Sequence, residues 1–420
     1  MIAHTPSGHV PPPGHVPPDV AFTGGYVVPV SGDPVEGGTV LIRNGKIIAV
    51  GAGVPVPDDV QIVDATGLWV LPGFVEAHSH LGIDEEGEGW SGDDLNESTD
   101  PNGARLRALD AVNPADPGFA DALSGGVTTA AVLPGSANPI GGQAVALKCH
   151  GRTVGDMVLR EPVAVKSALG ENPKRVHGDH GRLPSTRQGI AAVIRDALTR
   201  ARDHRARRPQ ESDPGLEVLA RVLDGELPWW QHAHRADDIG TALRLADEFG
   251  YRLVVHHGTE AHLLADLLAE RQIPVVSGPL TTGRGKPELR NRTPRSPALL
   301  AAAGVTLALT TDHNSVPIQY LVHQATIAVK EGLDRRTALR SITTTPAALL
   351  GLDDRVGALR PGLDGDVVLW SGDPLDTMSR AVRVYIDGRE VYRYGGQEAS
   401  APGCRTMKTS TGSWDSTVNP

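Results

Sequence analysis

The sequence is poor in cysteine and contains no long apolar run. Among its 420 residues are two cysteines, Cys149 and Cys404, too few for the disulfide framework of a small secreted module. No stretch approaches the roughly 20 consecutive apolar residues that a membrane helix needs, and no charged-then-apolar leader opens the chain. We therefore expect a cytoplasmic protein without a membrane partner.

Basic residues are also in deficit. The formal net charge is −10, and the lysines and arginines are scattered or lie in short clusters rather than along one stripe. We therefore expect no nucleic-acid partner, and the acidic balance bears only on solubility.

Two common catalytic signatures are missing. The sequence has no Gly-x-Ser-x-Gly elbow, which argues against a serine nucleophile. The pair Gly141 and Gly142 lacks the lysine and the serine or threonine of a phosphate-binding loop, so we propose no nucleotide cofactor.

The two ends of the chain differ in composition from the rest. Residues 1–18 repeat Gly-His-Val-Pro-Pro, and residues 396–420 are rich in serine and threonine. Neither segment carries enough apolar residues for a core, so both are expected to be disordered.

Short alternating runs follow the first segment and precede the last. Asn44-Gly45 and Asp387-Gly388 each separate β-branched runs, which is a strong signal for a β-hairpin. We predict that residues 19–68 and 357–395 together build one small β-sandwich beside the main domain.

Between them, residues 69–356 alternate strand-like and helix-like runs. Eight predicted strands fit a (β/α)8 TIM-type barrel, whose strands run parallel and whose active site lies at their C-terminal ends. The predicted strands are 74–80, 126–133, 143–148, 162–166, 227–232, 252–257, 273–277 and 305–312.

Possible metal ligands stand at the C-terminal ends of these strands. They are His78, His80, His232, His257 and Asp312. Side chains alternate along a strand, so His78 and His80 emerge on one face within reach of one ion. Imidazole suits zinc, and a catalytic zinc needs about three protein ligands and one open position.

These motifs resemble the amidohydrolase superfamily, and within it the imidazolonepropionase-like branch. The resemblance rests on Pro72 to His80, Gly125-Gly-Val-Thr-Thr, the histidines that end strands five and six, Thr311-Asp312-His313 and the Gly362-x-x-Gly-Asp366 motif. It implies hydrolysis of an amide-type C–N bond, in a ring, an N-acyl compound or a dipeptide, by metal-activated water.

The resemblance also implies roles for the strand-end residues. The four histidines become ligands of one or two divalent ions, expected to be zinc, and Asp312 becomes both ligand and proton shuttle. The expected partners are a small-molecule substrate and a second copy in a homo-oligomer. The alternatives are a deaminase on the same scaffold and a non-catalytic protein that kept the fold.

Periodicity leaves two choices between neighbouring histidines open. His256 and His257 alternate faces, and the family's His-Gly strand end favours His257 as the ligand. His232 and His234 share a face, and the better alignment favours His232.

The family also includes members in which a carbamylated lysine ends strand four and bridges two metals. Lys166 is the candidate for that position, and Lys148 at the end of strand three is its competitor. An ordinary salt bridge of Lys166, for example to Glu171, is the alternative.

Substrate contacts are expected from residues near these strand ends. His234 and Arg235 follow strand five, and Asn138 belongs to a motif shared by a restricted group within the branch. The basic loop after strand seven, with Arg284 and Arg290, would suit a substrate carboxylate.

Overall fold

The computed structural model describes residues 18–207 and 211–395. The predicted N-terminal arm, apart from its last residue, and the whole C-terminal tail lie outside the described residues. No helix within the described ranges is long and apolar enough to cross a membrane.

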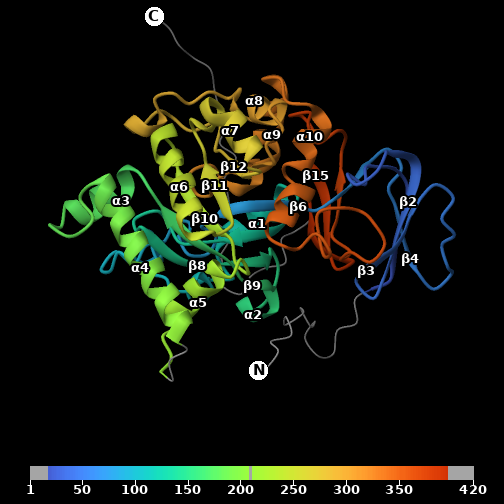
Figure 1. The fold of residues 1–420 in the computed structure, drawn as a ribbon. Helices are drawn as coiled ribbons and strands as arrows, with labels where there is room; N and C mark the ends of the chain where they lie inside the picture. The colour runs from blue at the N-terminus through green and yellow to red at the C-terminus, as the bar shows by residue number, and fades with distance from the viewer. Residues whose placement is uncertain (1–17, 208–210, 396–420) are drawn as a thin grey trace, which may run out of the picture.

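All eight predicted barrel strands occur, and they form one sheet, hydrogen-bonded in chain order (Figure 1). The predicted (β/α)8 barrel class is confirmed. The strands are β6 (Phe74–Ser79), β7 (Val127–Val132), β8 (Ile140–Lys148), β9 (Val158–Ala168), β10 (Trp229–Ala233), β11 (Leu253–His257), β12 (Val275–Ser277) and β13 (Leu307–Leu309).

One strand departs from the expected all-parallel arrangement. β8 pairs antiparallel with both β7 and β9, whereas the remaining neighbours in the barrel sheet pair parallel. The physical reason is the connection: residues 133–139 between β7 and β8 are too few for the crossover of a dozen or more residues that parallel neighbours need. The C-terminal end of β8 therefore lies at the opposite end of the barrel from the C-terminal ends of its neighbours.

The first and last strands approach each other and nearly close the barrel. The backbone N–H of His80 donates to the carbonyl of His313 at 2.8 Å, and the hydroxyl of Thr310 donates to the carbonyl of His78 at 2.9 Å. The end of strand one, with its two predicted ligands, is thereby held against the end of strand eight.

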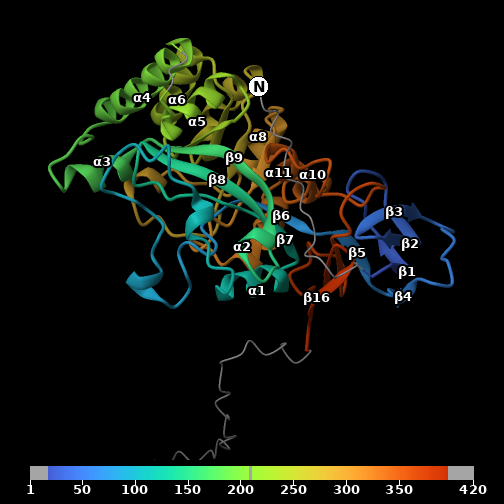
Figure 2. The same cartoon turned by 90° about the horizontal axis from the view of Figure 1, so that it is seen from below.

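Helices cover the outside of this sheet. Figure 2 shows α4, α5 and α6 on the side of the barrel away from β1 to β4. α6 ends at Gly250, whose φ of 75° suits a residue without a Cβ. The helices are α1 (Pro117–Ser124), α2 (Val154–Met157), α3 (Glu171–Gly178), α4 (Arg187–Arg207), α5 (Pro214–Leu223), α6 (Ala236–Phe249), α7 (Ala265–Glu270), α8 (Ser296–Ala302), α9 (Leu321–Lys330), α10 (Arg335–Arg340) and α11 (Thr344–Leu349).

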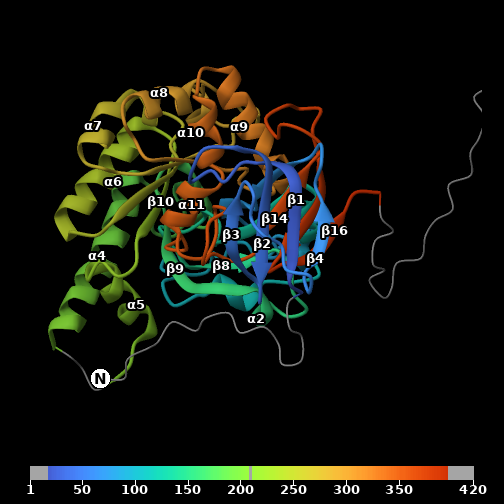
Figure 3. The ribbon, with the colours of Figure 1, turned by 90° about the vertical axis from the view of Figure 1, so that its right-hand side faces the viewer.

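Strands from both chain ends form a second sheet beside the barrel (Figure 1), and this sheet faces the viewer in Figure 3. Its order is β16-β15-β14-β5-β1-β2-β3, with β4 also pairing with β1. The Phe22 ring lies 4.7 Å from the Tyr385 ring, so the two chain ends share one core. The strands are β1 (Val20–Val27), β2 (Val35–Arg43), β3 (Lys46–Gly51), β4 (Gln61–Asp64), β5 (Trp69–Pro72), β14 (Val367–Trp370), β15 (Ala381–Ile386) and β16 (Arg389–Arg393).

Both predicted hairpins occur in this sheet. Asn44 and Gly45 have φ values of 50° and 75°, and Asp387 and Gly388 have 49° and 75°. Two consecutive positive φ values are typical of the tight turn that matches strand twist. The predicted domain limits stay a prediction.

A buried charge cluster joins the reversed strand β8 to the second sheet. The Lys148 ammonium lies 2.7 Å from Asp366, 3.0 Å from Asp364 and 3.2 Å from Asp387. Burial alone would lower the pKa of Lys148, but the three aspartates outweigh it and raise that pKa. Lys148 therefore stays charged and structural, at the end of the barrel opposite the strand-end histidines.

Replacing Lys148 with methionine should destabilise the protein by about 3–5 kcal/mol, because buried aspartates would lose their main cation. Lys46→Met is the matched control: Lys46 also contacts Asp364, but its side chain is 45% exposed, and such pairs contribute less than about 1 kcal/mol. Urea unfolding at pH 7 measures both. Equal losses in the two variants would contradict this account of the cluster.

Candidate metal centre

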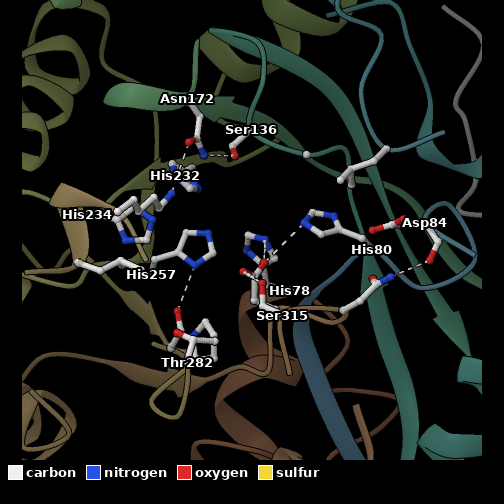
Figure 4. A pocket seen from close by; sticks show the side chains of 18 of the residues that line it. His78, His80, Asp84, Ser136, Asn172, His232, His234, His257, Thr282 and Ser315 are labelled. Atoms are coloured by element: carbon white, nitrogen blue, oxygen red, sulfur yellow. Dashed lines mark hydrogen bonds and ion pairs between the residues drawn. The ribbon is translucent and has the colours of Figure 1, made fainter. Parts of the chain in front are cut away.

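The predicted ligands converge on one cavity of about 380 Å³. Figure 4 shows His232, His234 and His257 on one side of His78, with His80 on the other. The predicted site residues that line the cavity are His78, His80, Lys166, His232, His234, His257 and Asp312.

Ligand-type atoms of His78, His257 and Asp312 lie within 4.8 Å of one another. One carboxylate oxygen of Asp312 is 3.2 Å from His78 Nε2 and 3.5 Å from His80 Nε2. Two imidazoles and a carboxylate, with a third imidazole beside them, are a donor set that zinc accepts. The residues present therefore fit a divalent cation.

Hydrogen bonds on the far side of two rings fix which nitrogen faces the cavity. His80 Nδ1 lies 2.8 Å from the carbonyl of Leu133, and His257 Nδ1 lies 3.0 Å from the carbonyl of Gly278. A carbonyl only accepts, so each Nδ1 carries the proton and each Nε2 keeps a lone pair. This is the tautomer that a metal ligand needs.

Burial sets the protonation states of these groups. It lowers the pKa of His78 and His232 well below the usual value and that of His257 to about 4, so the rings are neutral near pH 7. Burial opposes the charge of Asp312, but His257 and the strand-one histidines outweigh it when they carry a proton toward the carboxylate, and they hold the pKa of Asp312 well below its usual value. Neutral imidazoles beside an ionised carboxylate are ready to bind a cation.

The backbone is left-handed at two of these residues. φ is 69° at His257 and 52° at Asp312, a region that residues other than glycine rarely occupy. Such positions cost of order 1–3 kcal/mol and concentrate at functional sites. Here they turn both side chains into the cavity just where their strands end.

Glu76, which the sequence analysis did not single out, ties the ends of strands one and eight together. Its carboxylate accepts from the backbone N–H of His78 at 3.0 Å, from that of Thr311 at 2.9 Å and from the Thr311 hydroxyl at 2.7 Å. Burial raises the pKa of Glu76 to about 7. An acidic residue within an apolar strand was the available signal.

A second group of ligand-type atoms lies beside the first. Atoms of His232, His234 and Glu288 lie within 4.8 Å of one another. Glu288 already has partners: the N–H of Glu171 at 2.5 Å, Arg187 at 3.5 Å and Lys286 at 3.9 Å. Its charge is therefore balanced by the protein, and we assign no ion to this group.

Three predicted substrate contacts lie away from the cavity lining. Arg235 pairs with Asp237 at the start of α6, and the Arg284 guanidinium donates to the carbonyl of Arg292. Asn138 is buried, donating to the Glu97 carbonyl and contacting the His177 ring. These side chains are occupied by local partners, which sequence position alone could not show.

Other residues that the sequence analysis did not single out do line the cavity. Among them are Asp84, Ser136, Asn172 and Lys286. Lys286 reaches the amide oxygen of Asn172 at 3.4 Å. The loop predicted to bind a carboxylate thus presents Lys286 rather than Arg284, because only one face of the loop meets the cavity.

The Amidohydrolase family profile matches residues 69–391, which include every strand of the barrel. The chain belongs to the amidohydrolase family. The predicted resemblance to this superfamily and its imidazolonepropionase-like branch is confirmed, and with it the predicted enzyme class at the level of the family.

Three known proteins illustrate the relationship. A solved amidohydrolase from Thermotoga maritima MSB8 is 45% identical with a TM-score of 0.87, covering 89% of this chain and 100% of that one. Amidohydrolase tasK of Hapsidospora irregularis is 32% identical over 84% of this chain, which spans only 39% of that protein. An imidazolonepropionase of Acidiphilium cryptum is 28% identical, covering 81% of this chain and 89% of that protein.

Lys166 distinguishes itself among the cavity residues of this amidohydrolase. Its ammonium donates to the carbonyl of Pro134 at 3.1 Å, and no carboxylate within the described ranges lies close enough to form a salt bridge with it. Burial lowers the pKa of Lys166 to about 7. A substantial fraction of the amine is therefore uncharged and nucleophilic near neutral pH.

The depressed pKa of Lys166 predicts a pH dependence of stability. Between pH 7 and 10.5 the lysine is neutral in the folded chain but protonated in the unfolded chain, so the free energy of unfolding should rise with pH across that window. The full effect is on the order of 5 kcal/mol. Urea unfolding of metal-free protein in CO₂-depleted buffer measures it. Lys166→Met should remove the slope, and an unchanged slope in that variant would contradict the assignment.

Proposed function

We propose that the protein is a metal-dependent amidohydrolase that hydrolyses an amide-type C–N bond in a small molecule. The observation that supports this most directly is the grouping of His78, His257 and Asp312 ligand atoms within 4.8 Å, at the barrel's strand ends. The proposed substrate classes are cyclic amides, N-acyl amino acids and dipeptides. The cytoplasmic location and the homo-oligomer stay predictions.

The proposed cofactor is zinc, held by His78, His80, His257 and Asp312. When bound, such an ion lowers the pKa of water toward about 7 and polarises the scissile carbonyl. His232 and a carbamate of Lys166 are the proposed ligands of a second ion. That carbamate forms when the uncharged amine attacks CO₂, which makes one N–C bond and releases one proton.

Asp312 is the proposed proton shuttle. Its ionised carboxylate accepts a proton from water as the new C–O bond forms on the substrate carbonyl. The same proton then passes to the leaving nitrogen as the C–N bond breaks, so the carboxylate is restored. The low pKa of Asp312 keeps it ionised at the start of the cycle.

Lys286 is the proposed contact for a substrate carboxylate. Its ammonium lines the cavity on the side of His234 and Asn172 and is 29% exposed, so it is accessible to a ligand. A cation at this place favours the imidazolonepropionate, N-acyl amino acid and dipeptide classes over uncharged amides.

The rival deaminase activity finds less support. A deaminase on this scaffold is expected to use a carboxylate a few residues after the strand-five histidine, whereas this chain has His234 and Arg235 there. The His234 ring contacts the Thr259 hydroxyl at 2.8 Å and brings no carboxylate to the cavity.

The proposed function predicts bound metal and hydrolysis together. Protein purified without chelators should contain at least one divalent ion per chain, and Asp312→Asn should lose activity by about a hundredfold or more because the proton shuttle is gone. Carboxylate release from a panel of N-acyl amino acids, dipeptides and imidazolonepropionate tests hydrolysis, and ammonia release from purines, pyrimidines and triazines tests deamination. Absence of bound metal would overturn the proposal.

A carbamate on Lys166 gives a separate prediction: bicarbonate should raise metal loading in the wild type but not in Lys166→Met.

Substrate recognition gives a separate prediction. Lys286→Met should raise KM for carboxylate-bearing substrates about tenfold with little change in kcat, because the interaction is equally strong in ground and transition states. Arg284→Ala, outside the cavity lining, should leave KM unchanged. Steady-state kinetics on one N-acyl amino acid measures both variants. A rise in KM for Arg284→Ala but not for Lys286→Met would instead support Arg284 as the contact for the substrate carboxylate.

A further inference from the structure

His256 lies behind the cavity and contacts His78 directly. The two Nδ1 atoms are 2.7 Å apart, and His256 is fully buried on β11. His256 shares the face of β11 that carries Val254, which packs with Trp230 inside the barrel, so its ring lies in the barrel interior outside the cavity lining. The positive φ of His257 turns that ring into the cavity. An imidazole at this distance shares a proton with its partner.

Metal binding would fix which nitrogen of His78 carries the proton. His78 Nε2 faces Asp312 at 3.2 Å and must keep a lone pair to bind a cation. Its Nδ1 must then carry the proton and donate it, as the Nδ1 atoms of His80 and His257 do to carbonyls. The only acceptor within hydrogen-bond distance among the described residues is His256 Nδ1.

Among the residues that the structure describes, His256 forms a hydrogen bond through only one of its two ring nitrogens. Its Nε2 has no hydrogen-bond partner, and its ring packs 4.8 Å from the Trp230 ring. When His256 Nδ1 accepts the proton of His78, the proton of the neutral His256 ring must lie on Nε2, which has no hydrogen-bond acceptor near it in the described part of the chain. A buried polar group without a partner is expensive, so a specific role for it is expected.

We propose that His256 is a positioning residue that accepts the Nδ1 proton of His78 and so holds the lone pair of His78 Nε2 toward the metal. This inference rests on the proposed metal-dependent function. His256 itself touches neither substrate nor metal. The neutral imidazole takes the place that a backbone carbonyl occupies behind His80 and His257.

Two substitutions separate this role from packing. His256→Asn keeps an acceptor, since its side-chain oxygen stands near the position of Nδ1, whereas His256→Leu fills similar space without one. Loss of such a partner typically weakens metal binding by about 10–100-fold. We therefore expect the dissociation constant for Zn²⁺ to rise by that factor in His256→Leu and to stay within about threefold of wild type in His256→Asn, because the acceptor is retained.

His177→Leu is the matched control for losing a buried imidazole. His177 is also fully buried and makes one hydrogen bond, 2.8 Å to Asn138, away from the cavity. It should lower the melting temperature without changing the Zn²⁺ dissociation constant. Competition with a chromophoric chelator gives the constant, and melting of the metal-free forms reports folding separately.

The outcomes distinguish this inference from the proposed function. If the wild type binds no metal, the proposed function fails. If the wild type binds Zn²⁺ and His256→Leu binds it equally tightly, the positioning role fails. Should His256→Leu not fold, long-range ¹H–¹⁵N spectra of the Zn²⁺-loaded wild type decide: a proton on His256 Nε2 supports the role, and one on its Nδ1 overturns it.

Discussion

The site depends on holding neutral imidazoles around one ionised carboxylate where burial excludes most water. Burial keeps His78 and His257 uncharged near pH 7, while the pKa of Asp312 stays well below its usual value. Each histidine keeps this orientation only if the ring nitrogen that points away from the cavity has a hydrogen-bond partner of its own. The nearly closed barrel supplies those partners, since carbonyls from neighbouring strand ends lie behind His80 and His257, and the His256 ring lies behind His78.

Sequence alone predicted the barrel and the gathering of candidate ligands at its strand ends because both follow from short-range rules. Apolar runs of strand length recur between helical runs, and the rule that barrel sites lie at strand ends then points to His78, His80 and Asp312. The choice of His257 over His256 came from the family resemblance. The direction of β8 follows from a different quantity, the length of the loop before it. That length was readable in the sequence, but the regular alternation of strands and helices outweighed it.

Side-chain direction in loops was the part that sequence could not supply. Arg284 and Lys286 are two residues apart in one basic loop, yet only Lys286 meets the cavity. Asn138 belongs to a family motif but serves the loop around His177. A sequence motif indicates that a residue has a role. Which neighbours its side chain contacts depends on loop backbone angles, which sequence periodicity does not predict.

The two buried lysines show how the same residue type acquires opposite chemistry. Lys166 in strand four was the candidate for the carbamate, and Lys148 at the end of strand three was its competitor. Because β8 runs backward, Lys148 emerges at the far end among three aspartates and keeps its proton. Lys166 emerges at the cavity beside one carbonyl, and burial removes much of its charge near neutral pH. Strand direction therefore decides which amine is available to attack CO₂. The carboxylates around Lys148 keep it protonated, and a protonated amine has no free lone pair.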